Sequence, residues 1–288
     1  MIPLQRARFL KPFLLLLALL ATAGCSTLEA PTEPGPAPKM KAGYLFGCLA
    51  PGSLPDGRAF VPPPPAMDSV AFELDREISR KALTLQGSEH WKLAAADADL
   101  DFPPAAETFS CALDAPISEK ETPHLYRLLH RTLTDAGLST YTAKKKYRRK
   151  RPFMINGKPN CTPDYTERLE KDGSYPSGHA AIGWAWALIL SEVAPQRSDA
   201  LLARGRAFGQ SRVICNVHWQ SDVIQGRYLG AATVARLHAD AGFRKALAAA
   251  RREVASARAR ELSPQRDCKA EARALKLVPP GAPWPANR

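Results

Sequence analysis

The chain has 288 residues, of which 45% are hydrophobic, and its formal net charge at pH 7 is +12. A chain of this length and composition can bury one sizeable core, so we expect a single catalytic domain with tails rather than global disorder. The positive charge attracts anions such as nucleic acids, membrane surfaces or phosphorylated molecules, and charge alone does not choose among them.

The N-terminus has the pattern of an export signal. Basic residues precede a short apolar stretch at 13–21, and small residues follow it. Because this stretch is too short to span a bilayer, residues 1–25 are predicted to be a secretory signal peptide. Two alternatives remain for its end: ordinary cleavage near Ala23, or a lipoprotein signal in which Cys25 receives a lipid anchor. Either one predicts a protein that is periplasmic or anchored in the outer membrane, and no later segment of the sequence is apolar enough to span a bilayer.

Export permits disulfide bonds. The chain has six cysteines, and cleavage or lipidation at Cys25 leaves five for the folded domain. These are Cys48, Cys111, Cys161, Cys215 and Cys268. Two disulfides and one free thiol are therefore expected, although their connectivity does not follow from the sequence. The spacing matches no zinc pattern, and no metal or cofactor is predicted.

The composition divides the chain into a linker, one domain and an extension. Residues 26–43 are rich in Pro, Ala and Lys and are predicted to form a linker. The catalytic domain is predicted at 44–243. Within it, the prolines from Pro62 to Pro65 favour a stiff extended surface segment over a ligand for a proline-binding domain. Residues 244–288 are highly charged, which indicates a helical extension followed by a disordered, proline-rich tail.

Helical periodicity dominates the catalytic domain, and the alternation typical of strands is almost absent. Asp68 is predicted to cap one helix, and Thr122 followed by Pro123 predicts the start of another. Residues 180–194 are nearly all apolar, as in a buried central helix. Two more helices are predicted at 198–210 and 218–240. We therefore predict an all-α fold, a helical bundle.

Three short segments carry residues suited to catalysis, and the first contains a histidine and an aspartate. Their spacing places His218 and Asp222 on one face of a predicted helix. The carboxylate can hold the proton of one imidazole nitrogen and leave the other nitrogen free as a nucleophile. The alternative is an ordinary pair of surface side chains, which this spacing also produces.

The second segment, Ser177, Gly178 and His179, opens the apolar central helix. Backbone N–H groups at a helix start bind anions, and a glycine lets an anion approach the backbone closely. His179 would then stand where it can donate a proton. The alternative is a capping turn that contains a histidine by chance.

The third segment is a run of basic residues from Lys144 to Arg151, followed by Pro152. Taken alone, such a run indicates a solvated surface or a patch that binds nucleic acid, with Tyr147 interleaved. A nucleic-acid patch would not require a proline fixed behind Arg151. Tyr147 and Arg149 are expected to support the structure rather than to act in chemistry.

Together the three segments resemble the signature of the type 2 phosphatidic acid phosphatase superfamily, which includes the vanadium-dependent haloperoxidases. Lys-x6-Arg-Pro begins at Lys144, Pro-Ser-Gly-His begins at Pro176, and Ser-Arg-x5-His-x3-Asp begins at Ser211. Within that superfamily, residues from about 44 to 240 resemble the bacterial class A non-specific acid phosphatases, which are exported enzymes. The resemblance implies the helical-bundle fold of this superfamily.

The resemblance also implies a mechanism that needs no metal ion. His218 would attack phosphorus, Asp222 would orient it, and His179 would act as general acid and then as general base. The phosphate would be bound by Lys144, Arg151, Ser177, Gly178 and Arg212. Such a pair of histidines predicts a bell-shaped pH profile on the acid side. The expected activity is that of an acid phosphatase, a phosphoric monoester hydrolase of broad specificity.

Small phosphomonoesters are the expected partners, and the class suggests a homo-oligomer; no nucleic acid is predicted. Three alternative functions remain. The same residues would hold vanadate in a haloperoxidase, with His218 as the vanadium ligand. A lipid-anchored domain would act as a lipid phosphatase at a membrane surface. A protein that binds nucleic acid or the cell envelope through residues 144–151 would leave four residues without a role: His179, Arg212, His218 and Asp222.

Overall fold

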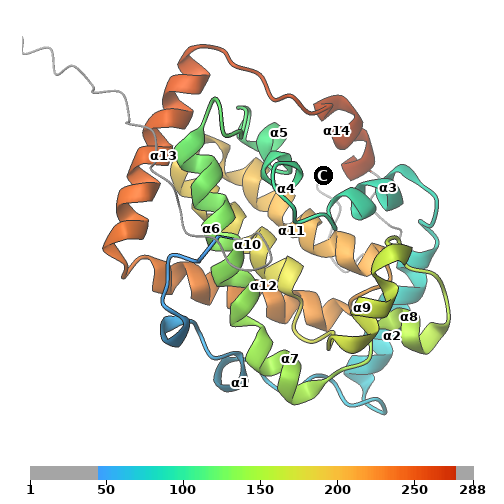
Figure 1. The fold of residues 1–288 in the computed structure, drawn as a ribbon. Coiled ribbons are helices and arrows are strands. Elements are labelled where there is room, and N and C mark those ends of the chain that lie inside the picture. Colours follow the sequence, from blue (N-terminus) through green and yellow to red (C-terminus); the bar gives the residue numbers. More distant parts are fainter. Residues whose placement is uncertain (1–44, 277–288) are drawn as a thin grey trace, which may run out of the picture. The chain divides into compact units, whose positions relative to one another are not determined.

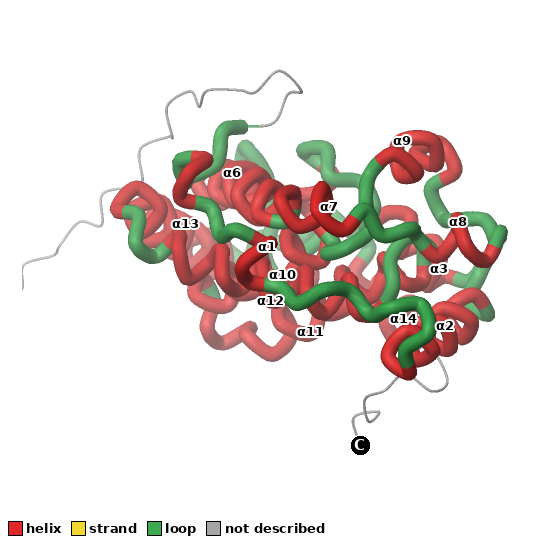
Figure 2. Tube along the Cα trace, turned by 90° about the horizontal axis from the view of Figure 1, so that it is seen from below, coloured by secondary structure: helices red, strands yellow, loops and turns green. Residues whose placement is uncertain are grey.

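The computed structural model describes residues 45–276, which form an all-α fold, as predicted (Figure 1). Over this range the chain consists of helices and loops, without a β-strand (Figure 2). The predicted signal peptide at 1–25, the linker at 26–43 and the tail beyond residue 276 lie outside the described residues. None of the described helices is long and apolar enough to cross a membrane.

The helices follow one another along the chain in two groups. The first group is α1 Gly57–Phe60, α2 Val70–Leu83, α3 Glu89–Ala96, α4 Pro104–Glu107, α5 Ser110–Leu113 and α6 Pro123–Ser139. The second group is α7 Tyr141–Tyr147, α8 Pro152–Asn156, α9 Thr166–Lys171, α10 Gly178–Val193, α11 Ser198–Ile214, α12 Gln220–Leu237, α13 Ala241–Ala259 and α14 Cys268–Lys276.

Helix α10 is the centre of the fold, as its apolar sequence predicted (Figure 1). It packs mainly against α11, α12 and α6, so it is apolar on nearly every side. Trp186 on α10 is fully buried, and its indole N–H donates to the carbonyl of Leu129 on α6 at 3.0 Å. Full burial of each large apolar side chain in this core contributes about 2 kcal/mol to folding.

Two glycines let α12 lie unusually close to the start of α10. A Cβ at Gly226 would collide with the carbonyl oxygen of Ser177, and a Cβ at Gly230 would collide with that of Ala181. Any side chain at these positions would therefore push the two helices apart. This close approach brings the segment that contains Asp222 next to the segment that contains His179.

Two of the predicted helix starts differ from the structure in their capping residue. The cap of α2 is Ser69, whose hydroxyl accepts from the amide of Phe72 at 3.2 Å, so the prediction of Asp68 was wrong by one position. Helix α6 begins at Pro123 as predicted, but the Thr122 hydroxyl makes no capping bond. That hydroxyl is engaged outside the helix, because it donates to the carbonyl of Pro116 at 3.1 Å.

The carboxylate that caps α6 comes from α13. Glu253 accepts hydrogen bonds from the amides of His124 and Leu125 at 2.9 and 3.0 Å. A carboxylate at this helix end satisfies amides that have no partner within the helix. No pattern local to α6 could reveal a cap that lies about 130 residues away.

Residues 244–276 comprise most of α13, a loop and α14, and α13 adds buried side chains to the main core. The expected boundary after residue 243 falls inside α13, which packs along α6. On α14, Glu271 lies 3.3 Å from the buried guanidinium of Arg204 on α11. A disulfide joins Cys111 to Cys268. These helices therefore belong to the same packed unit as the motifs.

The predicted two disulfides and one free thiol are confirmed for the described residues. Cys111 pairs with Cys268, Cys161 pairs with Cys215, and Cys48 is a free thiol. Each disulfide joins segments that are distant in the sequence, with separations of 157 and 54 residues. Closing loops of this length restricts the unfolded chain and stabilises the fold by about 2–5 kcal/mol for each bond.

Candidate active site

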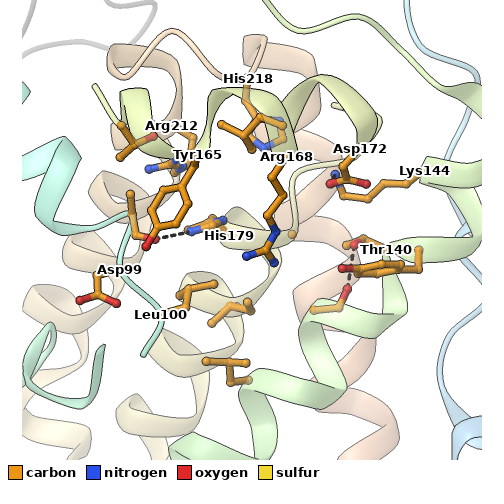
Figure 3. A pocket seen from close by; sticks show the side chains of 18 of the residues that line it. Asp99, Leu100, Thr140, Lys144, Tyr165, Arg168, Asp172, His179, Arg212 and His218 are labelled. Atoms are coloured by element: carbon orange, nitrogen blue, oxygen red, sulfur yellow. Dashed lines mark hydrogen bonds and ion pairs between the residues drawn. The ribbon is translucent and has the colours of Figure 1, made fainter. Parts of the chain in front are cut away.

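The three motifs meet at one cavity of about 500 Å³ (Figure 3). Six of the eight residues predicted for catalysis or phosphate binding line it: Lys144, Arg151, Gly178, His179, Arg212 and His218. Ser177 and Asp222 are not among the lining residues; their side chains cap α10 and contact His218, respectively. The structure therefore brings all eight into one region.

Two contacts fix the protonation of the His218 ring. Its Nδ1 lies 3.3 Å from Asp222 Oδ2, and its Nε2 lies 3.2 Å from Arg151 Nη1. A guanidinium group only donates and a carboxylate only accepts, so the proton belongs on Nδ1 and the lone pair on Nε2. Burial, followed by the charge of Arg151, lowers the pKa of His218 well below its usual value. His218 is therefore a neutral imidazole at the cavity, and its Nε2 lone pair accepts a hydrogen bond from Arg151.

Asp222 is held in place from several sides. Its Oδ2 also accepts from the Ser174 hydroxyl at 2.6 Å and from the Trp219 amide at 2.9 Å. The amide contact arises because Asp222 stands in the first turn of α12, where a carboxylate caps the helix. Its Oδ1 accepts from Arg149 Nη1 at 2.6 Å. A carboxylate fixed on both oxygens cannot rotate, so it holds the His218 ring in one orientation.

Arg149 supports the site, as expected, through a partner that the sequence reasoning missed. Its second nitrogen, Nη2, donates to Asp75 on α2 at 2.8 Å. Asp75 also accepts from the amide of Ser221 at 2.9 Å, so it ties α2 to the start of α12. The guanidinium lies within 6 Å of three aromatic rings, those of Phe72, Tyr175 and Trp219. Asp75 could have been found as a charged residue on the apolar face of an amphipathic helix.

Lys144 and Arg151 are buried cations at the same wall of the cavity. Lys144 donates to the carbonyl of Gly173 and lies 3.1 Å from Asp172 Oδ2. Arg151 donates from Nε to the carbonyls of Leu169 and Asp172 at 2.8 and 3.2 Å. Burial, followed by the charge of Arg151, lowers the pKa of Lys144 to about 8. The two cations form a cradle for an anion.

Arg212 is a buried cation that forms no ion pair within residues 45–276. Its Nε is buried without a hydrogen-bond partner, and its Nη1 reaches the carbonyl of Ala94 only at 3.4 Å. Burial, followed by the charge of Arg151, lowers the pKa of Arg212 to about 10, so the side chain is cationic at neutral pH. A buried charge without a counter-ion is costly, which indicates that an anionic ligand completes this site.

Helix α10 begins at the cavity and adds backbone donors to the three cations. The amides of Gly178 and His179 are in its first turn, where a helix offers them no acceptor. Ser177 precedes them, and its hydroxyl accepts from the amide of Ala180 at 3.2 Å. That bond leaves the hydroxyl proton of Ser177 available to a ligand, and its role in phosphate binding stays a prediction.

His179 faces the cavity with one ring nitrogen already engaged. Its Nε2 lies 3.1 Å from the carbonyl oxygen of Ala98, which only accepts, so Nε2 carries the proton and Nδ1 does not. The ring stacks on Phe208 with centroids 6.3 Å apart. Burial, followed by the charge of Arg212, lowers the pKa of His179 well below its usual value. Without a ligand, His179 is therefore neutral, with Nδ1 as a proton acceptor.

The turn between α11 and α12 positions Arg212 and His218 relative to each other. Asn216 in this turn has φ 62°, in the left-handed region, and its side-chain amide donates to the carbonyl of Lys158 at 3.0 Å. The preceding Cys215 is bonded to Cys161. The sequence left the pairing of Cys161 with Cys215 open, and no pattern in it singled out Asn216.

The outer part of the cavity is less polar than the cradle. Figure 3 shows the side chains of Tyr165 and Arg168, which line the cavity on either side of His179 in this view. The apolar part of the cavity wall includes Leu100, Leu138 and Ile182. A phosphate bound in the cradle would leave this part of the cavity for the remainder of its ester.

Comparison with known proteins identifies the family to which this chain belongs. The chain belongs to the PAP2 superfamily, whose family model matches residues 127–245. It is 46% identical over 201 residues to the non-specific acid phosphatase of Providencia stuartii, covering 69% of this chain and 81% of that relative. It is 46% identical over 196 residues to that of Salmonella typhimurium, covering 68% of this chain and 78% of the relative.

The acid phosphatase of Zymomonas mobilis is 39% identical over 203 residues, covering 70% of this chain and 77% of that relative. The solved structure of a bacterial vanadium-dependent iodoperoxidase matches at 20% identity with a TM-score of 0.46, over 72% of this chain and 62% of that one. Within the superfamily, the curated relatives place this chain among the class A non-specific acid phosphatases, and the enzyme class predicted from the motifs, an acid phosphatase, is confirmed.

Proposed function

We propose that this acid phosphatase hydrolyses phosphate monoesters of broad specificity through a phosphohistidine on His218, without a metal ion. The observation that carries the proposal is the His218 imidazole, held neutral with its Nε2 lone pair at a cavity whose wall contains three buried cations. Lys144, Arg151 and Arg212 supply the positive charge that a divalent metal would otherwise bring to the transferred phosphoryl group.

In the first step, the Nε2 lone pair of His218 attacks phosphorus and the ester P–O bond breaks. The bond formed is N–P, and the ring becomes cationic while its Nδ1 proton stays hydrogen-bonded to Asp222. His179 delivers a proton to the leaving oxygen, which departs as the alcohol. In the second step, His179 accepts a proton from water, the hydroxide oxygen attacks phosphorus, and the N–P bond breaks to release phosphate and restore neutral His218.

The donor role of His179 requires a proton that the ligand-free site disfavours. Burial and the positive charge of Arg212 hold the pKa of His179 low. A phosphate dianion that binds beside Arg212 offsets that positive charge, so it raises the pKa of His179 and favours the imidazolium form. The bound substrate thereby favours the protonated form of His179, the general acid, and this fits a bell-shaped pH profile on the acid side.

We also infer that the enzyme is exported to the periplasm, with or without a lipid anchor at Cys25. Two disulfides in the described residues support this proposal, because such bonds persist in oxidising compartments. A homo-oligomer remains an expectation from the class.

The experiment that tests the mechanism is hydrolysis of p-nitrophenyl phosphate from pH 4 to 8 in excess EDTA. Wild type is expected to stay active, and His218→Ala is expected to lose at least about a thousandfold in kcat. His238→Ala is the matched control, because His238 is a half-exposed histidine that pairs with Glu192 outside the cavity. Rapid quenching in alkali should also leave one phosphoryl group on the peptide that contains His218.

Activity that disappears with EDTA, or that survives in His218→Ala, would contradict the mechanism. A phosphoryl group found on another residue would overturn the assignment of the nucleophile.

A further inference from the structure

A carboxylate occupies the anion cradle of the ligand-free enzyme. Asp172 Oδ2 accepts from Lys144 Nζ at 3.1 Å and from Arg151 Nη2 at 3.2 Å. The two cations are almost completely buried, whereas the Asp172 side chain is 40% exposed. Figure 3 shows Asp172 beside Lys144 at the edge of the cavity. One carboxylate oxygen therefore stands where an oxygen of phosphate would meet both cations.

The carboxylate is not needed to hold the two cations in place. Arg151 donates to three backbone carbonyls, those of Leu169, Asp172 and Val217, at 2.8, 3.2 and 2.9 Å. Lys144 donates to the carbonyl of Gly173. These backbone acceptors remain whatever the side chain at position 172 is, so the charge of Asp172 has a function other than positioning.

We propose that Asp172 is an internal anion that competes with phosphate for Lys144 and Arg151, and so sets the affinity for the substrate and for the phosphate product. The inference rests on the proposed phosphate site. A phosphate that enters the cradle must take over both cations from Asp172 Oδ2, and the displaced carboxylate repels it from nearby. Weaker binding of the product favours its release, so the competition also shortens the time for which phosphate blocks the site.

Asp172 lines the active-site cavity and a second cavity beside it, so its charge acts among many other charged or titratable side chains. These are Asp99, Asp101, Tyr141, Lys144, Lys145, Arg148, Arg149, Lys150, Arg151, Tyr165, Arg168, Glu170, Lys171, His179, Arg212 and His218. Of the acidic residues among these, none forms an ion pair with Lys144 or Arg151 in the described chain.

The test is calorimetric titration of the wild type and of Asp172→Asn with inorganic phosphate at pH 7. The amide has nearly the same shape as the carboxylate but no charge, so phosphate is expected to bind about tenfold tighter, as for the loss of one half-exposed charge near the ligand. The KM for p-nitrophenyl phosphate should fall in parallel.

Two further variants control this experiment. Glu170→Gln removes the same charge from an exposed neighbour on α9 and should change phosphate affinity by less than about twofold. Asp172→Ser removes the carboxylate without leaving an amide that could bond to the cations, and it should tighten phosphate binding as Asp172→Asn does.

Unchanged or weaker phosphate binding in both variants at position 172 would overturn the proposal and make Asp172 a positioning residue for the cradle. An equal gain in phosphate affinity in Glu170→Gln would overturn the proposal as well, because the effect would then come from the net charge of the region and not from Asp172. The calorimetric titration measures phosphate binding and does not depend on ester hydrolysis. A wild type that binds phosphate but hydrolyses no ester would therefore contradict the proposed function and leave this test intact.

Discussion

The arginine between two buried carboxylates offers the sharpest test of how this site is held together. Arg149 bridges Asp222 and Asp75, whose side chains are 0% and 4% exposed. Replacing Arg149 with Met keeps the aliphatic length of the side chain, which packs among aromatic rings, but removes the charge. Two carboxylates that shared one cation would then face each other in the protein interior.

The expected cost follows from the burial of the partners. Removing one member of a buried ion pair costs about 3–5 kcal/mol, because it leaves an uncompensated charge. For a domain of this size that is a fall in Tm of roughly 10 °C. Adding Asp75→Asn to Arg149→Met removes one of the two stranded charges, so the double variant should recover about half of the loss.

Urea unfolding followed by circular dichroism measures these differences, with the midpoint and slope fitted for each variant. The matched control is Arg148→Met, at the adjacent exposed arginine, which should change stability by less than about 0.5 kcal/mol. A loss below about 1 kcal/mol in Arg149→Met would refute the reasoning. So would a double variant no more stable than the single one.

Two further predictions follow from the site. Because burial lowers the pKa of Lys144 to about 8 and the cradle needs the protonated amine, kcat/KM should fall above pH 8 by about tenfold more per pH unit than deprotonation of His179 alone causes. Lys144→Arg should remove that extra decline, and an extra decline kept in this variant would assign it to another group. Asn216 has a left-handed backbone conformation, so Asn216→Gly should change stability by less than about 1 kcal/mol, whereas Asn216→Val should lose about 2 kcal/mol or more. Thermal unfolding of the two variants checks this, and equal losses would show that the side-chain hydrogen bonds of Asn216 dominate instead.

The sequence predicted the parts of the site that are fixed by chemistry. Lys144, Arg151, Arg212 and His218 could be found because they stand in segments that resemble the signature of the superfamily, and the structure gathers them at one cavity. The central helix could be predicted because a segment that is apolar on every side must be buried.

What the sequence did not predict depends on contacts between distant segments. The cap of α6 is Glu253, which no local pattern on either helix indicates. Asp75 supports Asp222 through Arg149 and through Ser221, so its role appears once three elements are packed together. The shift of the α2 cap from Asp68 to Ser69 is a competition between adjacent residues that are both good caps.

The place of α14 has a consequence for biosynthesis. Its Glu271 contacts Arg204, whose guanidinium also lies 2.5 Å from Asp97, and Cys268 is bonded to Cys111. Arg204 and Cys111 are translated before α14, so they gain these two partners only when α14 has been made. A chain that ends before α14 would lack both contacts, so it should be less stable than the whole chain.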